Sequence, residues 1–112
     1  MTPMHRAALL LAGAGLAALP AVAHAAGDAT AGRRKAVACA VCHGPQGVSV
    51  AMDAPHLAGQ PAMYLGKELR AYRSGARLHE VMSLMAKPLS DDDIADLAAW
   101  FAAQKISVQA AP

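Results

Sequence analysis

The chain contains the stretch Cys39-Ala40-Val41-Cys42-His43, which predicts more about its fold and chemistry than any other part of the sequence. Two thiols three positions apart can both reach one porphyrin, and a histidine directly after the second thiol can swing under the ring and ligate its iron. The pattern C-x-x-C-H is accordingly the attachment signature of a c-type haem. The sequence has 2 cysteines, and both lie in this motif.

Three other uses of the two thiols remain open at this point. A zinc site would need a fourth ligand, and no second C-x-x-C or H-x-x-x-H follows. A thioredoxin-like redox pair would need a preceding strand in a βαβ frame, whereas the residues before the motif are rich in Ala, Arg and Lys. A structural disulfide would leave the adjacent His43 unexplained. Haem attachment accounts for all three side chains.

Residues 1–25 have the features of a secretory signal peptide. A short basic start precedes an apolar run over residues 7–19, and Ala23-His24-Ala25 fits a small-residue cleavage site. We predict cleavage after residue 25 or 26, which leaves residues 26–112 as one domain. An uncleaved membrane anchor is the alternative, but the run is short and mostly Ala and Gly. Export to the periplasm agrees with the motif, because c-type haem is attached after export.

The predicted domain is small and nearly neutral. Of the 10 Lys and Arg residues, Arg6 lies in the signal segment, which leaves nine against 8 Asp and Glu. A domain of this size buries a modest apolar core, and a covalently held porphyrin would complete it. The balance of charge gives no indication of nucleic-acid binding. We expect a monomer without stable membrane insertion.

Two helices are predicted on either side of the loop that follows the motif. Asp28 or Thr30 would cap a first helix over residues 28–38, with Gly32 and Val37 as contact points with another helix. Pro61 favours the first position of a second helix over residues 61–73, which Ser74 and Gly75 would end.

A third helix is predicted after Ser90. Ser90 would cap it, Asp93 would complete a capping box, and the acidic first turn suits the helix dipole. The apolar spacing that follows predicts a buried face made by Ile94, Leu97, Ala98 and Phe101. No alternating strand pattern occurs, so the predicted class is all-α.

The loop after the motif contains a candidate partner for His43. A ligating histidine usually donates its other ring N–H to an acceptor that fixes the orientation of the ring. We predict that the carbonyl of Pro55 is this acceptor; alternatively, Pro55 only stiffens the loop. His56 is expected to be an exposed loop histidine, because it would lie on the side of the ring that His43 occupies.

The residues themselves do not decide which side chain is the other axial ligand of the iron. His79, Met82 and Met85 precede the last helix and are the candidates. A thioether would cap the iron, exclude exogenous ligands and raise the reduction potential, whereas an open site would favour ligand binding or peroxidase-like chemistry.

A basic stripe is predicted on the second helix, formed by Lys67, Arg70 and Arg73 with Arg77 just beyond. It is either a solvated helix face or a surface that docks an acidic partner or balances the haem propionates.

Several segments in this order resemble a class I c-type cytochrome. They are Cys39-Ala40-Val41-Cys42-His43-Gly44, Pro55-His56-Leu57-Ala58-Gly59-Gln60, Tyr72-Arg73-Ser74-Gly75-Ala76-Arg77, Met82 through Met85-Ala86, and the run from Leu89 to Phe101. The resemblance is greatest to the small monohaem cytochrome c-553 type, which is similar to one half of the dihaem cytochromes c of the c-4 type. It implies a small cytochrome c fold, with three to five helices and loops wrapped around one covalently bound haem c.

The resemblance also implies roles for individual residues. Cys39 and Cys42 would hold the haem, and His43 would be the proximal iron ligand with Pro55 as its carbonyl partner. In this family the ligand methionine stands about eight residues before the serine that caps the last helix. Met82 stands eight residues before Ser90 and is therefore assigned the distal position, although Ser83 follows it where many members have proline. The first and last helices would cross near Gly32 and Phe101.

The implied function is electron transfer without bond chemistry, so we expect no enzyme activity. The chain would be a periplasmic one-electron carrier that cycles Fe(III)/Fe(II) and docks transiently with redox proteins such as an oxidase, a reductase or a dehydrogenase. A haem subunit of a periplasmic oxidoreductase complex is the alternative. An enzyme or gas sensor with an open distal site is a third possibility, and it requires that Met82 does not ligate.

Overall fold

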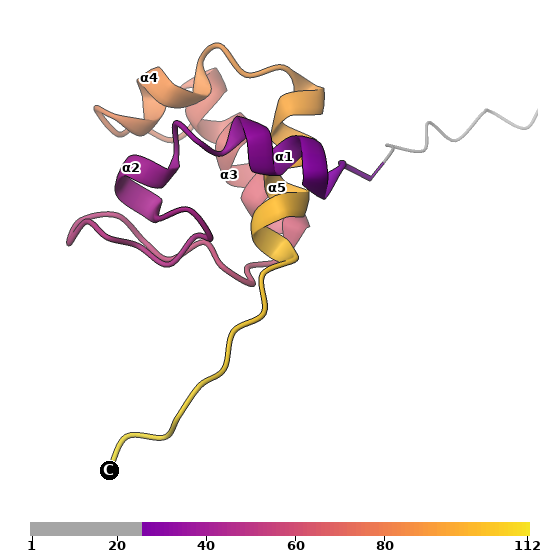
Figure 1. Cartoon of the computed structure of the whole chain (residues 1–112). Helices are drawn as coiled ribbons and strands as arrows, with labels where there is room; N and C mark the ends of the chain where they lie inside the picture. The colour runs from indigo at the N-terminus through magenta and orange to yellow at the C-terminus, as the bar shows by residue number, and fades with distance from the viewer. Residues whose placement is uncertain (1–25) are drawn as a thin grey trace, which may run out of the picture.

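The computed structural model describes residues 26–112, which form five helices and, within that range, no strand (Figure 1). The helices are α1 (Ala29–Lys35), α2 (Ala40–His43), α3 (Ala62–Ser74), α4 (Met82–Ala86) and α5 (Asp91–Ala102). The all-helical class is thus confirmed. None of the helices in the described range is long and apolar enough to cross a membrane. The predicted signal peptide lies outside the described residues.

Helix α1 begins where its capping residue predicts but ends early. Asp28 is the N-cap, and its carboxylate accepts hydrogen bonds from the backbone N–H groups of Thr30 and Ala31. The predicted extension to residue 38 is wrong, because the chain tightens into turns after Lys35. The N–H of Cys39 there bonds the carbonyl of Ala36, three residues back, at 3.0 Å. These turns redirect the chain into α2, which carries most of the C-x-x-C-H motif.

Helices α3 and α5 follow their sequence signals closely. Pro61 is the N-cap of α3 rather than its first helical residue, and Gly75 ends the helix with a left-handed φ of 83°. At the start of α5, Ser90 and Asp93 exchange both bonds of the predicted capping box. The predicted buried face of α5 is confirmed, since Ile94, Leu97, Ala98 and Phe101 are all 4% exposed or less.

Helices α1 and α5 cross in close contact at Gly32. A Cβ atom at Gly32 would overlap the backbone carbonyl of Asp96 and would lie 2.8 Å from the Cβ of Trp100. The crossing point therefore needs glycine, and the atoms nearest to Gly32 belong to Asp96 and Trp100, next to the expected Phe101, which shares a buried cluster with Ala36 at the end of α1. Val37 is 71% exposed and makes no helix crossing, because α1 has ended before it.

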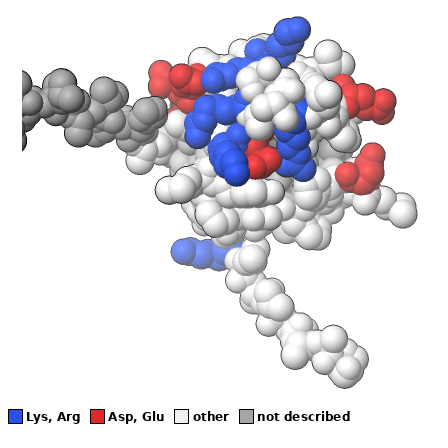
Figure 2. Space-filling model, turned by 180° about the vertical axis from the view of Figure 1, so that it is seen from behind, with Lys and Arg blue, Asp and Glu red and all other residues white. Residues whose placement is uncertain are grey.

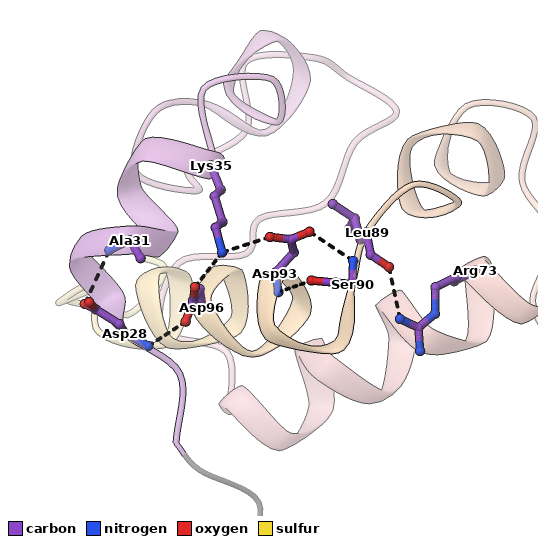
Figure 3. Close-up of polar contacts among 8 residues, drawn as sticks. All are labelled: Asp28, Ala31, Lys35, Arg73, Leu89, Ser90, Asp93 and Asp96. Carbon is purple, nitrogen blue, oxygen red and sulfur yellow. Dashed lines mark hydrogen bonds and ion pairs between the residues drawn. The ribbon is translucent and has the colours of Figure 1, made fainter.

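One lysine joins the end of α1 to the first turns of α5 (Figure 3). The Nζ atom of Lys35 lies 2.8 Å from Oδ1 of Asp93 and 2.6 Å from Oδ2 of Asp96. The other oxygen of Asp96 accepts the backbone N–H of Asp28 at 2.8 Å. The hydrogen bond from Lys35 is the main reason why the pKa of Asp93 is lowered to about 2 and that of Asp96 is also lowered. Two carboxylates thus hold both ends of α1 against α5.

Two glycine substitutions test whether the α1–α5 crossing needs the missing Cβ. Gly32→Ala should lower the free energy of unfolding by about 2 kcal/mol or more, because backbone atoms of α5 leave no room for a methyl group. Gly66→Ala in α3 is the matched control, since its new Cβ would meet only the flexible end of Arg70, at 3.3 Å. It should raise stability by up to about 1 kcal/mol, the helix-propensity gain. Guanidinium unfolding of the haem-loaded protein measures both, and equal effects would contradict a close crossing at Gly32.

The ion pairs of Lys35 predict a dependence of stability on acid pH. Because folding lowers the pKa of Asp93 from 3.8 to about 2, its ion pair stabilises the fold fully above pH 3.8 and loses this effect as pH falls towards 2. Lys35→Met should therefore lower Tm near neutral pH and flatten the fall of Tm across that acid range. Lys105→Met, in the exposed segment after α5, is the control and should follow the wild type. Parallel curves for wild type and Lys35→Met would contradict the prediction.

Candidate functional site

A mostly apolar cavity of about 180 Å³ lies between the motif and the helices that follow it. Its walls are Lys35, Ala38, Cys39, Leu69, Met82, Met85, Pro88, Leu89 and Leu97. The cavity brings the first cysteine of the motif together with both candidate methionines, about 40 residues later in the chain. A larger hollow of about 250 Å³, lined by Arg33, Ala36, Val37, Ala40 and Pro45, contains none of the candidate ligands.

His43 is held in one orientation by the loop that follows it. The residue is only 6% exposed, and its Nδ1 lies 2.9 Å from the carbonyl oxygen of Pro55. A carbonyl can only accept a hydrogen bond, so Nδ1 carries the proton and donates it. Nε2 is then the ring nitrogen left to bind a metal, with its basicity raised by the bond at Nδ1.

The loop of residues 44–60 reaches His43 because it folds back on the motif. The N–H groups of Leu57 and Ala58 both bond the carbonyl of Gly47, at 2.7 and 3.1 Å. Gly47 has a φ of 83°, and a Cβ there would lie 2.8 Å from the ring of Phe101. His56 is exposed, as expected, and its Nδ1 accepts the backbone N–H of Ser49 at 2.8 Å. The loop is thus closed by backbone bonds that bring Pro55 over His43.

The two thiols are placed by one short turn of helix. Cys39 is the N-cap of α2, and its carbonyl accepts the N–H of His43 at 2.9 Å. Cys39 and His43 are four residues apart, a spacing that puts side chains on one side of a helix. Both cysteines are partly buried and form no disulfide, and burial raises the pKa of the Cys39 thiol.

The two methionine candidates for the distal position lie on the short helix α4, and the third candidate, His79, precedes it. Met82 is its first residue and is half-buried, whereas Met85, one turn later, is 39% exposed. Both line the cavity, and His79 does not. The Nδ1 atom of His79 instead accepts the backbone N–H groups of Val81 and Met82, at 3.3 Å each.

A family model described as cytochrome c matches residues 29–105, which include every helix of the described part. The chain belongs to the cytochrome c family. Membership decides between haem and the alternative uses of the two thiols. The cofactor is haem c, bound covalently at the C-x-x-C-H motif, and the side chains fit it: two thiols, an oriented buried imidazole, and thioethers in an apolar cavity.

Relatives of this cytochrome include both longer and equally short proteins. It is 49% identical over 90 residues to cytochrome c4 of Pseudomonas aeruginosa, covering 80% of this chain and 45% of the relative. Cytochrome c-554(548) of Halomonas halodenitrificans is 46% identical over 83 residues, which are 71% of this chain and 100% of that protein. The chain thus spans about half the length of the cytochromes c4 and the whole of the shorter relative.

Solved structures show the same fold. Reduced recombinant cytochrome c4 from Pseudomonas stutzeri superposes with a TM-score of 0.69 at 43% identity, covering 74% of this chain and 48% of that chain. Thiosulfate dehydrogenase (TsdBA) from Marichromatium purpuratum gives a TM-score of 0.66 at 37% identity, covering 80% of this chain and 22% of that one. The small cytochrome c fold predicted from the sequence is confirmed.

The structure adds residues that the sequence pattern did not assign to the site. Lys35, Pro88 and Leu89 line the cavity. The spacing of four residues between Lys35 and Cys39 is a signal that would have placed the lysine near the motif. Pro88 and Leu89 offered no comparable signal, because only the packing of the segment between α4 and α5 brings them to the cavity.

The predicted basic stripe is divided by internal ion pairs. Arg73 lies 3.0 Å from the carbonyl of Leu89 and 2.6 Å from the carboxylate of Asp91. Arg77 lies 2.6 Å from Glu68, and this bond raises its pKa. Figure 2 shows Lys and Arg side chains gathered on the face that is hidden in Figure 1, with carboxylates among them. The side chains of Arg73 and Arg77 therefore form ion pairs within this chain before any contact with a partner protein.

Proposed function

We propose that this chain is a periplasmic one-electron carrier with a His43/Met82 haem c site. The observation that carries the proposal is the thioether of Met82 in the wall of the same cavity as Cys39, four residues before the oriented imidazole of His43, because His/Met ligation is the arrangement of electron-transfer cytochromes. When bound, the haem supplies an iron that changes between Fe(III) and Fe(II) by one electron.

The residues of this chain would have distinct roles at the site. Cys39 and Cys42 would form the two thioether links, and His43 would bind the iron through Nε2 while its Nδ1–H donates to the carbonyl of Pro55. Met82 would hold the iron through its thioether and would exclude exogenous ligands. Met85, more exposed, packs beside the ring.

The cavity walls would keep water from the iron. Leu69 and Leu89 are partly buried, and Leu97 is 2% exposed and belongs to the main core cluster. An apolar wall lowers the local dielectric and favours the less charged state of the site, which raises the reduction potential. A buried, hydrogen-bonded ligand such as His43 also moves little when the charge changes, and a small rearrangement keeps electron transfer fast.

The partner would be another redox protein. The proposed periplasmic location follows from the signal features of residues 1–25 together with haem attachment after export. One relative, 45% identical over 67 residues, is named thiosulfate dehydrogenase electron acceptor, from Stutzerimonas stutzeri. This supports a dehydrogenase among the possible donors, and electron transfer rather than bond chemistry as the role of this chain.

A specific observation also favours a second candidate function, that of a haem subunit in a periplasmic oxidoreductase. The chain matches 22% of the TsdBA thiosulfate dehydrogenase chain at a TM-score of 0.66, so a domain like this one occurs within a larger redox protein. A stable subunit and a free carrier differ in how tightly they hold the partner.

Optical spectra of methionine variants test the axial ligand. The exported, haem-loaded wild type should show the far-red sulfur-to-iron band when oxidised, and the reduced form should not bind carbon monoxide. Met82→Ala should lose the band and bind the gas, because removal of the thioether opens the site. Met85→Ala is the matched control and should keep both wild-type properties. A wild type that binds carbon monoxide would refute the carrier and favour a sensor or enzyme.

Size-exclusion chromatography of a native extract distinguishes the carrier from the subunit. A free carrier should elute as a small monomer, and its electron exchange with the partner should slow as ionic strength rises, since exposed charges guide transient encounters. Lys67→Ala and Arg70→Ala should reduce this salt dependence, because Arg73 and Arg77 are already paired within the fold. Elution at high mass with a catalytic protein would support the subunit instead.

A further inference from the structure

The helix that carries Met82 has little apolar support of its own. Helix α4 is five residues long, and only Ala86 in it is buried. Leu84 is 72% exposed, and the flanking Val81 is 46% exposed. Short helices are marginal, because the first turn fixes several residues for few hydrogen bonds. The hydrogen bonds at the start of this short helix therefore matter for where its backbone lies.

Two reciprocal hydrogen-bonding side chains close the turn at its start. The Nδ1 atom of His79 accepts the N–H groups of Val81 and Met82, both at 3.3 Å. In return, the hydroxyl of Ser83 accepts the backbone N–H of His79 at 3.1 Å. The arrangement resembles a capping box, in which two side chains accept free N–H groups of one turn, but His79 lies two residues before Val81, the N-cap of α4, whose own side chain makes no capping bond.

The bonds act on Met82 more directly than on Met85. The N–H of Met82 is one of the two groups that His79 holds, whereas the N–H of Met85 bonds the carbonyl of Val81 within the helix, at 3.0 Å. Without His79, the backbone N–H of Met82 would lose its acceptor. Met82 is also the residue that lines the cavity. His79 does not line the cavity itself, so its influence passes through the backbone.

We infer that His79 and Ser83 are positioning residues that hold the Met82 backbone so that its thioether stays directed into the haem cavity. The inference rests on the proposed role of Met82 as the axial ligand. His79, one of the three residues considered for ligation, thereby fixes the ligand instead of being one. Ser83, the residue directly after Met82, closes the same turn from its other side.

The experiment compares the haem-loaded wild type with His79→Ala, His79→Asn and Glu80→Ala. Imidazole competes with the thioether for the ferric iron, so its apparent Kd reports how often Met82 leaves. His79→Ala should bind imidazole roughly fivefold more tightly and show a weaker far-red band, the change expected from the loss of one helix cap. His79→Asn should restore wild-type behaviour, because the asparagine oxygen accepts the same N–H groups.

Glu80→Ala is the matched control, since it changes an exposed neighbour in the same turn and should leave both readouts unchanged. Ser83→Ala should shift imidazole binding in the same direction as His79→Ala. The inference is overturned if His79→Ala binds imidazole like the wild type, or if His79→Asn behaves like His79→Ala. A wild type without the far-red band would overturn the Met82 ligand itself, and with it the inference, so the two failures are distinguishable.

Discussion

The close approach of α1 and α5 at Gly32 is the contact on which the other parts of this cytochrome depend. Because Gly32 has no side chain, the backbone of α5 comes near enough for Lys35 to reach Asp93 and Asp96. The chain turns directly after Lys35, so the same contact sets the position of Cys39 relative to Leu97 across the cavity. Cofactor attachment and helix packing are thereby joined at one end of a seven-residue helix.

The segments that carry the two proposed iron ligands are built by different physical means. On the proximal side, the loop of residues 44–60 is closed by backbone hydrogen bonds and a glycine with a left-handed φ, and it delivers the Pro55 carbonyl to a buried His43. On the distal side, a short and largely exposed helix carries Met82, and polar side chains hold its first turn. The proposed proximal ligand is thus buried, whereas the proposed distal ligand lies beside a few local hydrogen bonds.

Most of the local structure could be predicted because its causes are local. The caps Asp28 and Ser90, the end of α3 at Gly75 and the buried face of α5 all follow from side chains within a turn or two. The predicted end of α1 was wrong by three residues, because the turns after Lys35 serve the attachment of the motif to the core. Helix propensity describes the local preference of each residue, so it does not predict that the helix must end at Lys35 to connect the motif to the core.

The sequence by itself determined the cofactor class, the helical signals and the set of candidate ligands, because C-x-x-C-H, capping boxes and apolar spacing act over a few residues. Only the tertiary structure decided which of these meet: the cavity shared by Cys39 and Met82, and the distance from His43 to Pro55. It also showed Lys35 as the link between helices, Arg73 as an internal partner and His79 as an acceptor for the backbone N–H of Met82. Such contacts join residues distant in the chain, or depend on backbone directions that side-chain patterns do not encode.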